Sequence, residues 1–171
     1  MHRWTLSAAI GAAVMISSAG SAHAAQPVVS GSYNRDEEGS DAAFQAIESA
    51  LAGLPSAQRP LARMSMRKSI ATSRFRISLA GSRFSIKYDA KTPIVLWIGG
   101  EPVRWKLVEG LVFHVSAKAN GDAVSLTFRG DDSERTTVYR SVGEQLVEET
   151  TIISPLLSTP ISYKLVYNRE N

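Results

Sequence analysis

The chain has 171 residues, which is the length of a single domain, since domains usually hold about 100–200 residues. It carries 19 Lys and Arg against 16 Asp and Glu, a net charge of +3, and it contains no cysteine. The lack of cysteine excludes disulfides, cysteine-ligated zinc, iron–sulfur clusters and a cysteine nucleophile. It also excludes a bacterial lipoprotein, because the lipid is attached to a cysteine.

Residues 1–24 have the pattern of a secretory signal peptide. Arg3 gives a positive start, residues 6–16 form an apolar run, and residues 22–24 (AHA) form a cleavage site. A membrane anchor is the alternative, but serines and a glycine interrupt the segment before it reaches the roughly 20 apolar residues of a span. We therefore expect a periplasmic or secreted protein of about 147 residues, with no transmembrane segment after cleavage.

One or two helices are predicted after a flexible leader at residues 25–40, which shows no sustained period. The first helix spans 41–54, with Ser40 or Asp41 as its cap and Gly53 and Pro55 as stop signals. Its apolar side chains share one face at helical spacing. They are Ala43, Phe44, Ile47, Ala50, Leu51 and Leu54.

The second predicted helix, 57–71, carries Arg59, Arg63 and Arg67 at a spacing of four residues, which predicts one basic stripe. Pro60 fits this helix only in its first turn. A basic amphipathic helix can lie on an anionic membrane. The alternative, which we favour, is a solvated helix over one end of a barrel or sheet.

From residue 72 the apolar period changes from 3.6 to 2, which is typical of strands with one buried face. Tight turns separate the strands, for example at Ala80-Gly81 and Asn120-Gly121. The spacing leaves no room for the crossovers of a parallel sheet. We predict an all-β fold: an antiparallel up-and-down barrel of eight or nine strands, preceded by one or two helices. The predicted strands are 74–79, 83–88, 93–98, 102–108, 111–118, 124–128, 135–140, 145–153 and 161–168. The single domain then spans 41–171, with helices in 41–71 and the barrel in 72–169.

The stretch GDAVSLTFRGDDSERTTVYRSVGEQLVEETTI, followed by ISYKLVYNR, resembles the last third of a fatty-acid-binding protein. It is also similar to exported lipocalin-like bacterial proteins without an assigned function. The resemblance covers about 97 residues, 74–169, and implies a calycin, or lipocalin-like, barrel. A barrel of about eight strands encloses space for its own side chains or for one small ligand.

Three features depart from this family. The helices are expected before all strands, whereas fatty-acid-binding proteins insert them after the first strand. The Gly-x-Trp of lipocalins is missing from the first strand. The last strand reads Tyr163-Lys164-Leu165-Val166-Tyr167 in place of the family's Arg-x-Tyr carboxylate clamp. The fatty-acid site of the family is therefore not carried over to this chain.

Catalytic and metal-binding patterns are missing from the sequence. His114 is the one histidine outside the signal peptide, and no G-x-S-x-G elbow accompanies it. Glu148 and Glu149 point to opposite faces of a strand, so they cannot share a site. We therefore expect no catalytic residue, metal or cofactor, and no enzyme activity.

If the barrel is closed, its interior takes the apolar parity of the strands. Arg135 and Tyr139 share a face; they point inward together, or both point outward while Thr136 and Val138 point in. A buried arginine would need an anionic ligand or an acid. The interior residues predicted from parity are Phe75, Phe84, Ile86, Tyr88, Phe113, Phe128, Tyr163 and Tyr167. The candidate ligand-binding residues are Tyr88, Phe113, Phe128, Arg135, Tyr139, Tyr163 and Tyr167.

Charge is distributed unevenly along the chain. Residues 54–89 hold eight basic side chains and one acidic one. Nucleic acid is disfavoured as a partner because Phe75 and Phe84 lie on the strand face opposite the arginines. The leading hypothesis is a non-enzymatic exported binding protein for a small apolar or amphipathic, lipid-like ligand. The alternative is an envelope interaction protein with a solid barrel, working through its N-terminal helices or through a basic face that binds anionic lipid or envelope polymer.

Overall fold

The computed structural model describes residues 29–70, 72–89, 91–106 and 112–170. The predicted signal peptide, 1–24, and the first residues of the predicted leader lie outside this range. The helices are a short 3-10 turn η1 (Glu38–Ser40), α1 (Asp41–Leu51) and α2 (Arg59–Ile70). The strands are β1 (Gly31–Asp36), β2 (Arg74–Ala80), β3 (Arg83–Tyr88), β4 (Ile94–Trp97), β5 (Val103–Lys106), β6 (Val112–Asn120), β7 (Ala123–Arg129), β8 (Glu134–Val142), β9 (Gln145–Ile153) and β10 (Ile161–Arg169).

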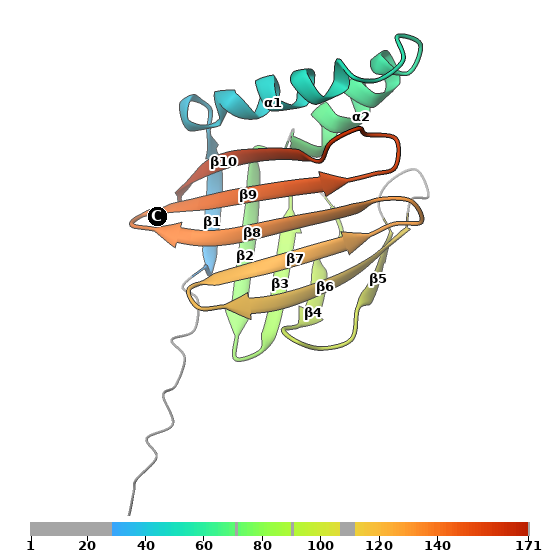
Figure 1. Cartoon of the computed structure of the whole chain (residues 1–171). Coiled ribbons are helices and arrows are strands. Elements are labelled where there is room, and N and C mark those ends of the chain that lie inside the picture. The colour runs from blue at the N-terminus through green and yellow to red at the C-terminus, as the bar shows by residue number, and fades with distance from the viewer. Residues whose placement is uncertain (1–28, 71, 90, 107–111, 171) are drawn as a thin grey trace, which may run out of the picture.

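The strands form one ten-stranded antiparallel sheet in the order β4-β3-β2-β1-β10-β9-β8-β7-β6-β5. Figure 1 shows β6–β10 running across the front while β1–β4 cross behind them. The sheet curls into a nearly closed barrel. Its two end strands, β4 and β5, have no ladder between them, and the Gly99 N–H donates to the Ala117 carbonyl just past β4. The predicted class is confirmed, with ten strands in place of eight or nine.

Strand β1 corrects two predictions. Residues 31–36 are not part of a flexible leader, and the helices do not precede all strands, because β1 comes first and pairs with both β2 and β10. Its sequence is polar except for Tyr33, which is 1% exposed. These residues form a strand because they pair with a neighbouring strand on both edges. Such long-range pairing leaves no local apolar period in the sequence. The first of the three departures, the expected place of the helices before all strands, is therefore wrong.

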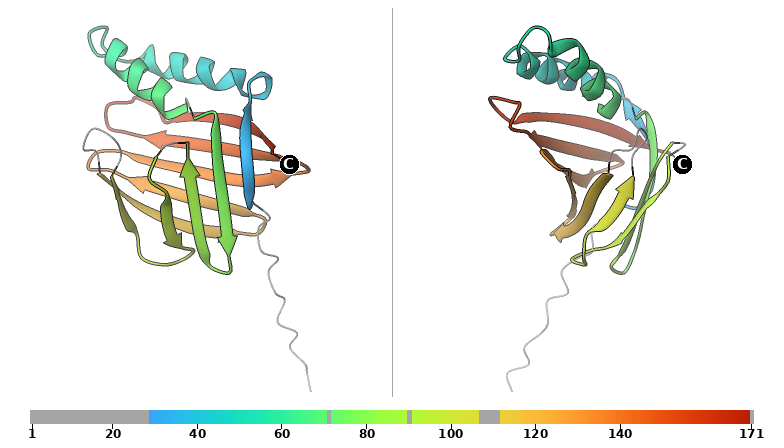
Figure 2. Two further views of the ribbon diagram at one scale, coloured as in Figure 1. Left: turned by 180° about the vertical axis from the view of Figure 1, so that it is seen from behind. Right: turned by 90° about the vertical axis from the view of Figure 1, so that its right-hand side faces the viewer.

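The helices cover one end of the barrel above β10 (Figures 1 and 2). The apolar face of α1 packs there, with Ala43, Ile47 and Leu51 buried. Helix α1 ends at Leu51, short of the predicted residue 54, and Pro60 lies in the first turn of α2, as predicted. Ser40 makes no side-chain capping bond; its hydroxyl accepts a hydrogen bond from the buried Val166 N–H at 3.2 Å. Ser40 therefore fixes the start of α1 to β10 instead of capping the helix.

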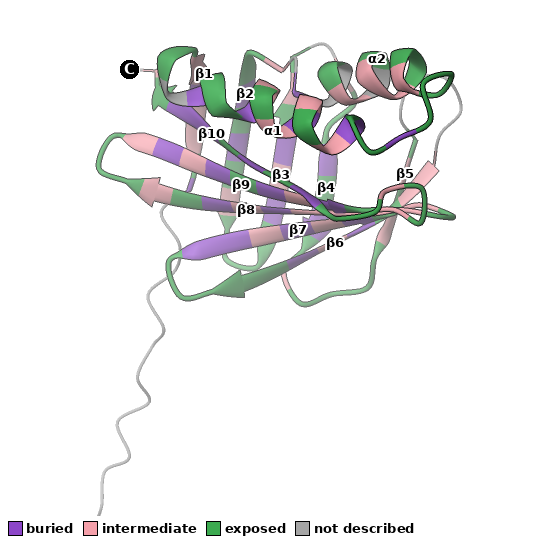
Figure 3. Ribbon diagram, turned by 45° about the horizontal axis from the view of Figure 1, so that its top comes forward, coloured by how far each residue is buried: buried purple, intermediate pink, exposed green. Residues whose placement is uncertain are grey.

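Alternation of buried and exposed residues along the strands separates an interior from a surface (Figure 3). Gly81 and Gly121 have positive φ angles of 59° and 61°, which tight hairpin turns require and glycine adopts without strain. These turns set the register, and the register decides which side chains point inward. No helix of the described residues is long and apolar enough to cross a membrane.

Candidate functional site

The eight side chains predicted to be interior all lie at buried or half-buried positions. Phe75, Phe84, Ile86, Phe128, Tyr163 and Tyr167 are buried, whereas Tyr88 and Phe113 are half-buried. The structure also decides which face of β8 points into the barrel. Tyr139 is fully buried, and the Arg135 side chain is 24% exposed, so both point inward. Whether these residues bind a ligand stays a prediction.

A polar cluster lies inside the barrel on β8 and β9. The Arg135 guanidinium contacts the Glu148 carboxylate at 3.2 Å and donates through Nε to the Thr137 hydroxyl at 3.1 Å. Glu148 also accepts a hydrogen bond from Thr150 at 3.1 Å. Thr137 and Thr150 lie opposite each other in the ladder, with their hydroxyls 3.0 Å apart. We call Arg135, Thr137, Glu148 and Thr150 the charged cluster.

Tyrosines border the charged cluster. The hydroxyls of Tyr88, from β3, and Tyr139, from β8, are 2.9 Å apart, which joins two opposite parts of the barrel. A hydrogen bond connects Tyr167 to Glu148. Burial is the main cause that raises the pKa of Tyr88, Tyr139 and Tyr167 above the ordinary value. These phenols therefore remain protonated near pH 7 and can donate as well as accept.

Burial also governs the charged pair. It raises the pKa of Glu148 above its ordinary value of 4.5, and the favourable contacts with Arg135, Thr150 and Tyr167 offset this only in part. Burial opposes the charge on Arg135 too, but its neighbours, Tyr163 and Glu148 foremost, raise its pKa overall, so it stays cationic. The carboxylate is 3% exposed and its desolvation outweighs its pairing. Fold stability alone therefore does not account for this pair.

Aromatic side chains flank the charged cluster on two sides. Phe75 contacts Tyr33, Tyr88, Tyr139 and Tyr167, with ring centroids 4.6–5.8 Å apart. On the other side the Arg135 guanidinium lies 5.7 Å from the centroid of the Phe128 ring.

Phe128 in turn contacts Trp105 and Phe113, with ring centroids 6.0 and 6.4 Å apart. A continuous chain of contacts thus runs from Glu148 through Arg135 and Phe128 to Trp105.

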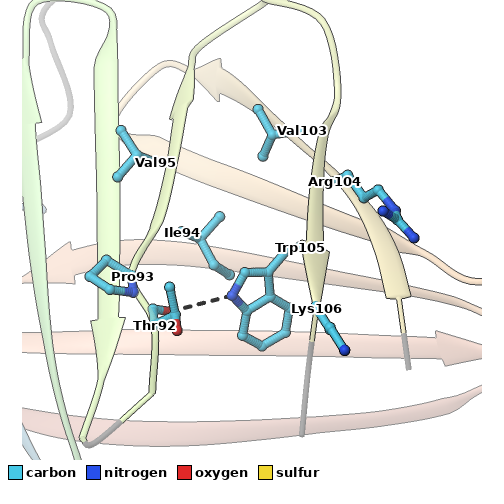
Figure 4. A pocket seen from close by; sticks show the side chains of 8 residues that line it. All are labelled: Thr92, Pro93, Ile94, Val95, Val103, Arg104, Trp105 and Lys106. Atoms are coloured by element: carbon cyan, nitrogen blue, oxygen red, sulfur yellow. Dashed lines mark hydrogen bonds between the residues drawn. The ribbon is translucent and has the colours of Figure 1, made fainter. Parts of the chain in front are cut away.

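Trp105 reaches the gap in the sheet. A pocket of about 320 Å³ lies between the end strands β4 and β5, at the lower end of the usual range for small-molecule sites. The indole N–H of Trp105 donates to the Thr92 carbonyl across the gap at 3.3 Å (Figure 4). The pocket is lined by Thr92, Pro93, Ile94, Val95, Val103, Arg104, Trp105 and Lys106. Trp105 lines this pocket and contacts Phe128, which in turn contacts Arg135.

Sequence reasoning missed two parts of this site. Glu148 was expected on a different face from Glu149, which is confirmed, but its pairing with Arg135 was not predicted. The signal was present: Leu146 and Ile152 are apolar positions of one parity, and Glu148 lies between them. Trp105 was also missed, because β5 has only four residues and its alternation, Val103 and Trp105 inward, is short.

The predicted basic stripe on α2 is used within the fold. Arg63 and Arg67 both pair with Glu48 on α1, at 2.8 and 3.0 Å, and the hydrogen bond from Arg63 helps to lower the pKa of Glu48. Arg59 donates to the carbonyls of Leu54 and Ala52 just after α1. These contacts hold the two helices together, so the stripe gives no support to an anionic lipid or envelope polymer as a partner. His114 is exposed on β6, outside the barrel interior.

Comparisons place this geometry among solved structures. A structure described as REP1-NXSQ fatty acid transporter matches with a TM-score of 0.54 and 16% identity, over 83% of this chain and 96% of that chain. Human cRBP IV matches with the same score and identity, over 83% and 98%. An SAHS protein from Ramazzottius varieornatus matches with a TM-score of 0.57 and 14% identity, over 84% and 96%.

No protein-family model matches the chain, and no curated protein matches it in sequence. At these identities the structural matches show the fold and nothing finer. The chain therefore has a lipocalin-like barrel fold, similar to the fatty acid transporter and fatty-acid-binding protein structures that it matches.

Proposed function

We propose that the protein is an exported, non-enzymatic binding protein that holds a small amphipathic, lipid-like ligand inside its barrel. One observation carries this proposal: the Arg135–Glu148 pair lies inside the barrel, and ring contacts through Phe128 connect it to Trp105, which lines the β4–β5 pocket. Ligand sites in proteins commonly combine an apolar lining with a few placed polar groups. Burial of the apolar part of the ligand would contribute about 25 cal/mol per Å².

The structural neighbours support binding as the general function. Their descriptions name a fatty acid transporter and fatty-acid-binding proteins. In this chain the apolar part of a ligand would contact Trp105, Phe113 and Phe128, and its polar end would meet Arg135 and Tyr139. Tyr88, Tyr163 and Tyr167 complete the proposed lining. Export rests on residues 1–24 of the sequence, so the protein would act in the periplasm or outside the cell.

Native mass spectrometry of the protein purified from its own cells tests this proposal, with lipid extraction in parallel. We expect a mass that begins at residue 25 and a co-purifying small molecule near one-to-one stoichiometry. An empty protein that takes up nothing from a panel of single-chain lipids would refute interior binding. A mass that includes residues 1–24 would refute cleavage and leave binding to be judged separately.

Tryptophan fluorescence gives a second readout at the pocket. The chain has three tryptophans, of which Trp4 is in the predicted signal peptide and Trp97 is 58% exposed. In a Trp97→Phe variant of the mature chain, Trp105 is the single reporter. Adding hexadecanol should shift and change the intensity of its emission, with a one-site titration. An unchanged spectrum alongside a bound ligand would place that ligand away from the β4–β5 pocket.

A further inference from the structure

The interior charges of the barrel balance each other. The Arg135 guanidinium and the Glu148 carboxylate form a salt bridge at 3.2 Å. Glu148 is the one charged residue in the buried class among the described residues. Each member of the pair is therefore the counter-ion of the other, and together they contribute no net charge.

The strand neighbours of the pair are uncharged. Arg135 lies opposite Phe128 on β7 and Ile152 on β9. Glu148 lies opposite Tyr139 on β8 and Leu165 on β10. Tyr88, which reaches this wall from β3, is a protonated phenol. No neighbouring strand position therefore supplies a second cation beside Arg135 that could balance an incoming anion.

This arrangement discriminates between head groups by charge. A carboxylate placed near Arg135 would also lie near Glu148, and two buried anions would share one cation, at a cost in repulsion and desolvation. An ammonium group placed there would be repelled by the positive charge of Arg135. An uncharged hydroxyl, aldehyde or amide meets no such penalty, and the phenols of Tyr88, Tyr139 and Tyr167 can donate to it or accept from it.

We propose that the barrel selects single-chain lipids with an uncharged, hydrogen-bonding head group, such as a long-chain alcohol, aldehyde or amide, and rejects the corresponding carboxylate. Glu148 is the residue that sets this preference, because it pairs with Arg135 and leaves no free cation for an incoming carboxylate. The inference rests on the proposed function, since it assumes that the ligand binds inside the barrel.

A panel of ligands with one chain length tests the preference on the wild-type protein near pH 7. Hexadecanol, hexadecanamide, palmitate and hexadecylammonium are each titrated by native mass spectrometry, and in the Trp97→Phe variant against the Trp105 signal. We expect hexadecanol and hexadecanamide to bind at least about tenfold more tightly than palmitate, the factor expected from a charge-assisted hydrogen bond that cannot form. Equal or tighter binding of palmitate would overturn the inference and leave the proposed function standing. Uptake of none of the four would refute the proposed function itself.

Glu148→Gln tests the assigned residue, with Glu149→Gln as a matched control on the exposed face of the same strand. Glutamine keeps the shape and one acceptor oxygen but frees the charge of Arg135. We expect the affinity for palmitate, relative to hexadecanol, to rise at least about tenfold in Glu148→Gln and to stay unchanged in Glu149→Gln. An unchanged ratio in a folded Glu148→Gln protein would overturn the role of Glu148.

A double variant covers the case in which Glu148→Gln does not fold. Arg135→Gln with Glu148→Gln removes both charges together. It should keep the preference for hexadecanol and gain no affinity for palmitate. A gain for palmitate in this double variant would show that Arg135 is not the group that Glu148 neutralises.

Discussion

The two walls of the barrel carry different kinds of inward side chain. The wall of β2–β4 is largely apolar, and six of its inward residues are each no more than 2% exposed: Phe75, Ile77, Phe84, Ile86, Ile94 and Leu96. The wall of β8 and β9 places Arg135, Thr137, Glu148 and Thr150 on the same interior. Both walls have the same alternation and the same antiparallel ladder. Hydrophobic burial explains the first wall, whereas the second holds a carboxylate whose desolvation exceeds its pairing.

This contrast indicates that the inward side chains of β8 and β9 are not chosen for stability alone. A wall built only for stability would continue the apolar parity through β8 and β9. Substitutions on the two walls should differ in the size, the sign and the pH dependence of the change in unfolding free energy.

The largest effect is expected on the apolar wall. Phe84 is 0% exposed, so Phe84→Ala leaves a cavity and should lower the free energy of unfolding by about 3–5 kcal/mol. The loss should be the same at pH 5 and pH 7, because no charged partner is involved. Urea denaturation at both pH values checks this. A loss that depends on pH would contradict the view that this wall acts by packing alone.

Arg135→Met should cost about 3 kcal/mol at pH 7, near the lower end for a broken buried pair because a quarter of the side chain is exposed. Without the guanidinium, Glu148 is a buried carboxylate lacking its cation. The loss should shrink as the pH falls, because the protonated carboxyl needs no counter-ion. Urea denaturation across this pH range is the measurement. A loss that does not change with pH would mean that Arg135 stabilises through packing.

Replacing both charged residues should change the free energy of unfolding in the opposite direction. Arg135→Met with Glu148→Met removes the desolvation cost on both sides and should raise the free energy of unfolding by about 1–4 kcal/mol. The same variant should still bind hexadecanol more tightly than palmitate, because it offers no cation to a buried carboxylate. Thermal and urea unfolding give the first result, and the ligand panel gives the second. A double variant less stable than wild type would show that the pair supports the fold.

The smallest expected effect is the pH dependence of the wild-type pair. The folded pKa of Glu148 is raised above 4.5, so its contribution to stability is fully present below about pH 4.5 and is lost as the pH rises through the folded value. Relative to Glu148→Gln, the wild type should therefore gain stability on acidification from pH 7. The difference between their urea midpoints isolates this group, since the other carboxyls are shared. A difference that grows as the pH rises would mean that pairing exceeds desolvation.

The inward parity of the strands could be predicted from sequence because it is local. Phe75, Phe84 and Phe128 each lie in an alternating run that assigns the inward face without knowledge of the neighbouring strand. Strand β1 could not be predicted in this way. Its residues are mostly polar, and its strand state depends on pairing with β2 and β10.

The site was predictable as a set of side chains but not as a set of contacts. Parity places Arg135 and Tyr139 on one face of the strand. It does not decide whether that face points inward, because both parities of 135–140 contain polar residues. The pairing with Glu148 depends on the β8–β9 register, in which Tyr139 lies opposite Glu148. That register is set by the turn and by burial on both strands together.

The most direct test of the central claim is a crystal structure of the mature protein grown with hexadecanol. The account predicts one alkyl chain inside the barrel, in contact with Trp105 and Phe128, with its hydroxyl within hydrogen-bond distance of the tyrosines or of the Arg135–Glu148 pair. The pair itself should remain closed. Hexadecanol bound only on the outer surface, or an alkyl chain whose hydroxyl points away from β8 and β9, would contradict the account.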